Sequence, residues 1–126
     1  MYMKVTERQV GAVTILDLTG NLTIDHFAER LKDRTTTLIK QGQINVLVNL
    51  ADVPYIDSGG LGQLVASYTS IAKAGGSMKL LHANAKNQHL LVITRLATVF
   101  DTFESEDEAV ASFQQPRKGT LAGSPS

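Results

Sequence analysis

The chain has 126 residues, of which 43% are hydrophobic and 19% charged, which is enough apolar material for one compact domain with a single core. Lysine and arginine together number 12, as do aspartate and glutamate, and this zero net charge argues against direct nucleic-acid binding. Cysteine is absent, which excludes disulfides, thiol nucleophiles and thiolate metal sites. The chain has neither a signal-peptide region nor the roughly 20 apolar residues that a membrane-spanning helix needs. We therefore expect a cytoplasmic protein without membrane insertion.

The first part of the chain predicts a hairpin, a helix and a buried strand. Residues 4–10 and 13–20 are rich in β-forming residues and flank a glycine-containing link, which indicates an N-terminal β-hairpin. Residues 23–41 carry an apolar stripe at helical spacing, and Gly42 stands where a helix-ending glycine is expected. Residues 44–50 are short, β-branched and almost continuously apolar. That pattern is typical of a central parallel strand covered on both faces.

The rest of the chain continues the alternation of helices and strands. Residues 58–74 show the clearest helical spacing of apolar residues, and residues 77–82 predict the next strand. A third helix is expected from residue 84 to about residue 96, followed by a short strand at 99–103. The acidic run after Ser105 resembles a capping box, which predicts a short terminal helix.

This order of elements predicts an α/β fold with a mixed, mainly parallel sheet of about five strands and about four helices. The domain is expected to span residues 1–113. Residues 114–126 are polar, rich in Gly, Pro and Ser, and without periodicity, so we expect a disordered C-terminal tail.

One glycine-rich turn stands out as the candidate functional segment. It belongs to residues 52–62, which join the predicted buried strand to the clearest helix, and it consists of Asp57, Ser58, Gly59, Gly60, Leu61 and Gly62. In α/β sheets, functional residues gather at the carboxyl ends of the strands. Ser58 is expected either to cap the helix or to lie in its first turn, close to the positive end of the helix dipole. Three glycines so near a helix start cost helix stability, which suggests that something other than helix stability selects them. Their lack of side-chain bulk would let another protein approach the turn closely.

The segment resembles the Asp-Ser-(Ser/Thr)-Gly-Leu-Gly signature of STAS domains, and of the anti-sigma factor antagonists in particular. The resemblance extends to Leu18-Thr19-Gly20-Asn21-Leu22, which is similar to Leu-Xaa-Gly-Glu-Leu in that family, and to Val48-Asn49-Leu50-Ala51-Asp52-Val53 before the switch. Gly75-Gly76 also matches. Together these segments cover about residues 4 to 113, which implies the STAS fold for the whole domain.

The resemblance implies a switch rather than an enzyme. In that family a partner anti-sigma factor, which is also a serine kinase, phosphorylates the serine after the aspartate, and this position is Ser58 here. The unphosphorylated protein binds the kinase and releases the sigma factor, and a PP2C-type phosphatase restores it. We expect no cofactor, no metal and no catalytic residue. The expected partner-binding residues are Asn21, Thr23, Asp57, Ser58, Gly59, Gly60, Leu61 and Gly62.

Two positions depart from the family pattern. The usual second Ser or Thr of the signature is Gly59 here, which leaves Ser58 as the only hydroxyl in the segment. Many relatives carry an acidic residue shortly after Gly-Glu-Leu, where this chain has Thr23.

Three other interpretations compete with the switch. Ser58 could simply cap the helix, with the glycines shaping the turn. The domain could be a subunit of a larger signalling scaffold or transport complex, as some STAS proteins are. It could also be an enzyme or a small-molecule binder, but Ser58 has no evident His or Lys base nearby in sequence, and the three histidines lack metal-ligand spacing.

Overall fold

The computed structural model describes residues 3–24 and 28–114, in which strands and helices largely alternate. In chain order the elements are β1 (Lys4–Val10), β2 (Val13–Thr19), α1 (Ala28–Lys40), β3 (Asn45–Asp52), α2 (Ser58–Lys73), β4 (Ser77–Leu81), α3 (Ala85–Ile93), the 3₁₀ turn η1 (Leu96–Thr98), β5 (Thr102–Phe103) and α4 (Glu106–Ser112). The predicted tail, apart from Gln114, lies outside the described residues. No helix of the described part is long and apolar enough to cross a membrane.

The five strands form one mixed sheet in the order β1-β2-β3-β4-β5. The β1–β2 hairpin is antiparallel, and the other three neighbouring pairs are parallel. The predictions of an N-terminal hairpin, a mainly parallel sheet and a central strand at 44–50 are therefore confirmed. β3 lies in the middle of the sheet, so its side chains are covered on both faces, as its continuous apolar pattern indicated.

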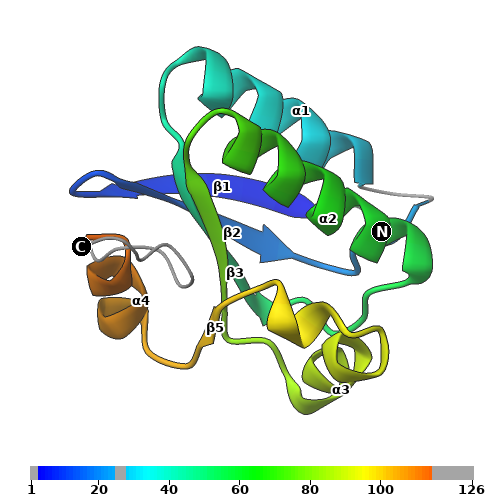
Figure 1. Cartoon of the computed structure of the whole chain (residues 1–126). Helices are drawn as coiled ribbons and strands as arrows, with labels where there is room; N and C mark the ends of the chain where they lie inside the picture. The colour runs from blue at the N-terminus through cyan, green and yellow to red at the C-terminus, as the bar shows by residue number, and fades with distance from the viewer. Residues whose placement is uncertain (1–2, 25–27, 115–126) are drawn as a thin grey trace.

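Helices cover both faces of the sheet, with α1 and α2 side by side on one face and α4 on the other (Figure 1). Side chains alternate between the two faces along each strand. Val46 and Val48 of β3 accordingly belong to the larger core, which also contains Leu64 and Ile71 of α2. Leu47 belongs to a smaller core that Ala109, Val110 and Phe113 close from the α4 side.

The predicted elements at 23–41, 84–96 and 99–103 are longer than the observed ones. Helix α1 begins at Ala28, and residues 25–27 lie outside the described part. Helix α3 ends at Ile93 because Arg95 adopts a left-handed conformation, with φ +65°, and a 3₁₀ turn follows. Phe100 packs in the larger core with only 2% of its surface exposed, so the last strand pairs over two residues only.

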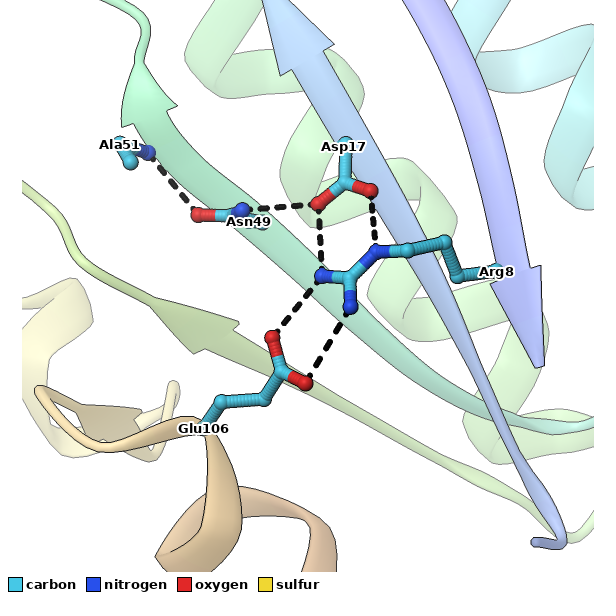
Figure 2. A network of polar contacts seen from close by, with 5 residues as sticks. All are labelled: Arg8, Asp17, Asn49, Ala51 and Glu106. Carbon is cyan, nitrogen blue, oxygen red and sulfur yellow. Dashed lines mark hydrogen bonds and ion pairs between the residues drawn. The ribbon is translucent and has the colours of Figure 1, made fainter. Parts of the chain in front are cut away.

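A polar network ties the hairpin to the terminal helix across the α4 face of the sheet (Figure 2). The Arg8 guanidinium donates to both carboxylate oxygens of Asp17, at 2.6 and 3.0 Å, and to both of Glu106, at 2.9 and 3.2 Å. Asn49 of β3 donates to Asp17 at 2.7 Å. The hydrogen bonds from Arg8 lower the pKa of Asp17 and of Glu106 below their usual values. The network thus joins β1, β2, β3 and α4.

Glu106→Gln should lower the unfolding free energy at pH 7 by about 0.5–1 kcal/mol, the range of an exposed but bidentate ion pair. Because the pKa of Glu106 is lowered in the folded protein, its contribution is present above its usual pKa of about 4.3 and is lost as the pH falls below that value. Urea unfolding should therefore show that the difference in unfolding free energy between the wild type and Glu106→Gln is smaller at pH 3 than at pH 7.

Glu104→Gln is the matched control, because Glu104 is exposed and forms no ion pair with any residue that the structure describes. An equal loss in both variants, or a Glu106→Gln loss unchanged at pH 3, would contradict the role given to the network.

Candidate functional site

The candidate segment lies at the carboxyl end of β3, where the loop after β2 runs beside it. The Leu22 N–H donates to the carbonyl of Tyr55 at 3.0 Å, and the Asp57 N–H donates to the carbonyl of Leu22 at 3.2 Å. Leu22 and Ile56 form an isolated parallel bridge. These contacts extend the pairing of β2 and β3 beyond the strand ends. The loop with exposed Asn21 and half-buried Thr23 is thereby held against the start of α2.

Asp57 joins this loop to the helix. Its carboxylate accepts a hydrogen bond from the Gly60 N–H at 2.7 Å, which makes it the N-cap of α2. The other carboxylate oxygen accepts from the Ile24 N–H at 3.3 Å. Asp57 therefore fixes both the helix start and the neighbouring loop.

Ser58 is the first residue of α2 and is exposed. The sequence left open whether Ser58 caps the helix or lies in its first turn, and the structure assigns the cap to Asp57. The interpretation of Ser58 as a simple cap is therefore wrong. Its hydroxyl lies in the first turn, where the positive end of the helix dipole favours a nearby anion.

The glycines differ in what surrounds them. A Cβ on Gly60 would lie 2.0 Å from the Leu22 carbonyl oxygen, so only glycine lets the loop approach the helix this closely. A Cβ on Gly59 would lie 2.5 Å from the Ile24 Cβ, and Ile24 thus occupies the space that the family's second Ser or Thr requires. Gly62 has open space around it. Leu61 packs in the larger core and is 7% exposed. Gly60 and Leu61 therefore support the site from the protein interior and are not part of its exposed surface.

Helix α3 forms the far side of a groove next to Ser58. The groove has a volume of about 280 Å³, and its lining includes Tyr55, Ser58, Lys86, His89, Leu90 and Ile93; we call it the Ser58 groove. The sequence-based site predictions included no residue of α3, because α3 is distant in sequence from Ser58, and Tyr55 was not among the predicted partner-binding residues. One signal was available in the sequence: Leu90, Leu91, Val92 and Ile93 are four consecutive apolar residues, more than one face of a helix can bury.

The groove brings Ser58 near a histidine and a lysine, which the sequence could not show. A serine nucleophile needs its hydroxyl hydrogen-bonded to the base. Within the described residues, neither His89 nor Lys86 makes such a bond to Ser58. The arrangement leaves the hydroxyl exposed to another protein.

The family model for the STAS domain matches residues 4–109. The chain belongs to the STAS domain family. This match, the mixed five-stranded sheet and the four helices confirm the resemblance that the sequence suggested. The STAS domain here covers nearly all of the residues that the structure describes.

Anti-sigma factor antagonists are among the named relatives of this STAS domain. The anti-sigma-B factor antagonist of Bacillus subtilis (strain 168) is 31% identical over 86 residues, which cover 68% of this chain and 77% of the relative. A structure of an anti-sigma factor antagonist from Mycobacterium paratuberculosis has a TM-score of 0.79 at 17% identity, covering 90% of this chain and 95% of the other. The Bacillus cell fate determinant SpoIIAA in its phosphorylated form has a TM-score of 0.69 at 20% identity, covering 86% and 97%. The two structures show the shared fold.

Proposed function

We propose that this STAS domain is an anti-sigma factor antagonist that phosphorylation at Ser58 switches off. Its unphosphorylated form binds an anti-sigma factor serine kinase and so releases the sigma factor. A PP2C-type phosphatase then removes the phosphate. The observation that carries the proposal is the exposed hydroxyl of Ser58 at the first residue of α2, in a turn held by Asp57. The name of the Bacillus subtilis relative and the phosphorylated form of SpoIIAA support it.

The geometry suits a substrate better than an enzyme. Ser58 Oγ takes the γ-phosphoryl group of ATP bound to the kinase, ADP leaves, and the hydroxyl proton passes to a base of the kinase. This chain supplies only the acceptor. Exposed Asn21, Ser58 and Gly62 form the contact surface, with half-buried Asp57 and Thr23 beside them. Phosphorylation adds about −1.5 to −2 charges in the middle of that surface, next to Asp57. The fold can stay unchanged while the interface is blocked.

Counting the phosphates that the purified cognate kinase adds from ATP tests whether Ser58 is the acceptor. Intact-mass spectrometry should show one added phosphate on the wild-type protein and none on Ser58→Ala, because Ser58 is the only hydroxyl in the signature. Ser70→Ala is the matched control, since Ser70 is an exposed serine near the other end of the same helix.

Ser70→Ala should still take up one phosphate, and peptide mapping should place it on Ser58. Phosphate on Ser58→Ala, or on another residue of the wild-type protein, would rule out Ser58 as the acceptor.

A further inference from the structure

Two nitrogen-bearing side chains of α3 line the Ser58 groove. Lys86 and His89 are three residues apart, a spacing that places them on the same side of a helix. The Lys86 Nζ lies 5.7 Å from the centre of the Tyr55 ring, which places the ammonium against the loop that leads to Ser58. The groove therefore combines a phosphate acceptor, a lysine ammonium and an imidazole that can donate a hydrogen bond.

The position of α3 relative to Ser58 is held by side-chain amides. Asn87 is buried and donates to the carbonyl of Val53 at 2.9 Å, and Asn84 donates to the carbonyl of Pro54 at 3.2 Å. Asn84 also caps α3, accepting from the Asn87 N–H at 2.7 Å. Lys86 lies between these two anchors, so its backbone is held next to the loop that carries Ser58.

The groove has a cation without a matching anion. Asp57 is the carboxylate in the lining, and both of its oxygens accept hydrogen bonds from backbone N–H groups, those of Gly60 and Ile24. Among the side chains of residues 3–24 and 31–114, no carboxylate comes within 4.0 Å of a side-chain nitrogen of Lys86 or His89. An anion that entered the groove would therefore meet an ammonium already in place.

We propose that Lys86 and His89 hold the phosphate of phosphorylated Ser58 within the same chain. The proposal rests on Ser58 being the phosphoacceptor, and it assigns to α3 a part in the switch. A phosphoryl group carries its oxygens two bonds beyond Ser58 Oγ, and Ser58 is one of the residues that line the groove. Charge-assisted hydrogen bonds from an ammonium and an imidazole to a phosphate dianion are among the strongest that side chains form. The dianion is then stabilised relative to the singly charged form.

Phosphorus NMR on protein with phosphoserine encoded genetically at position 58 tests this without any kinase. The phosphate loses its second proton near pH 6, and a bound cation moves that midpoint to lower pH. We expect the midpoint in Lys86→Gln to lie about half a pH unit above that of the phosphorylated parent, the size of a partly exposed ion pair. His89→Gln should move it in the same direction.

Lys73→Gln is the matched control, because Lys73 is an exposed lysine at the opposite end of α2, roughly 22 Å from Ser58 at 1.5 Å per residue. Its midpoint should equal that of the parent. Equal phosphate midpoints in Lys86→Gln, His89→Gln and the parent would overturn the proposal. It would also be overturned if Lys86→Gln weakened kinase binding by the unphosphorylated protein but left the phosphate midpoint unchanged. Because the phosphoserine is encoded, these results do not depend on whether a kinase modifies Ser58.

Discussion

Replacing Ser58 by glutamate is expected to weaken binding to the anti-sigma factor kinase about 1000-fold. Burying an ion without a matched cation in an interface costs several kcal/mol, and about 4 kcal/mol corresponds to this factor. Isothermal titration calorimetry with the purified kinase measures the loss. Authentic phosphoserine, which adds both charge and bulk at the same position, should also weaken binding.

The stability of the Ser58→Glu variant should change little. The carboxylate is exposed at the first residue of α2, where the helix dipole favours it by about 0.3–1 kcal/mol, and the charge of Asp57 opposes that gain. Equal thermal unfolding of variant and wild type would show that the lost affinity comes from the interface.

Two variants serve as controls for the binding measurement on Ser58→Glu. Ser58→Ala should bind like the wild type, because it adds neither charge nor bulk. Ser70→Glu adds a charge at an exposed site on the last turns of α2 and should also bind normally. Wild-type affinity in Ser58→Glu would be incompatible with a switch at this residue.

Gly60→Ala should cost about 2–3 kcal/mol of unfolding free energy, at the upper end of the usual range for added bulk in a packed region. The new Cβ would lie 2.0 Å from the Leu22 carbonyl oxygen. That carbonyl accepts the Asp57 N–H and the Leu22 side chain is buried, so the loop cannot retreat without breaking the turn. Urea denaturation should show the lower unfolding free energy of Gly60→Ala. We also expect this variant to bind the kinase more weakly.

Gly62→Ala is the matched control, with the opposite expected sign. Gly62 lies in the same helix two residues later and has open space around it, so alanine should raise the unfolding free energy by up to about 1 kcal/mol. If Gly60→Ala and Gly62→Ala stabilised the protein equally, the inferred steric conflict between a side chain at position 60 and the Leu22 carbonyl would be contradicted.

Local signals predicted most of the fold because they act over a few residues. The apolar run at 44–50 indicated a strand covered on both faces, and β3 is the central strand. The expected cap at Ser105 is present, and Asn84, where the third helix was expected to start, caps α3. The third helix was predicted to end near residue 96 but ends at Ile93, because Arg95 adopts a left-handed conformation. That conformation depends on how the chain packs after α3, and the position has no glycine that would indicate it.

The candidate site was predicted only in part for the same reason. Asp57 and Ser58 are adjacent in sequence, so their place at the start of a helix could be read from the glycine-rich turn. The contacts of Gly59 with Ile24 and of Gly60 with Leu22 span more than 30 positions, and no local pattern encodes them. Lys86 likewise reaches the site only because α3 packs against the loop after β3.

The sequence by itself determined the order of strands and helices, the STAS resemblance and the one hydroxyl in the signature, since these depend on residue identity and short-range periodicity. Tertiary structure decided that the Ile24 N–H donates to the Asp57 carboxylate, beside exposed Ser58. It also decided that Ile24 fills the space beside Gly59 and that α3 places a lysine next to Ser58. These relations arise where separate segments pack at one edge of the sheet, and packing between distant segments has no signature in the local pattern.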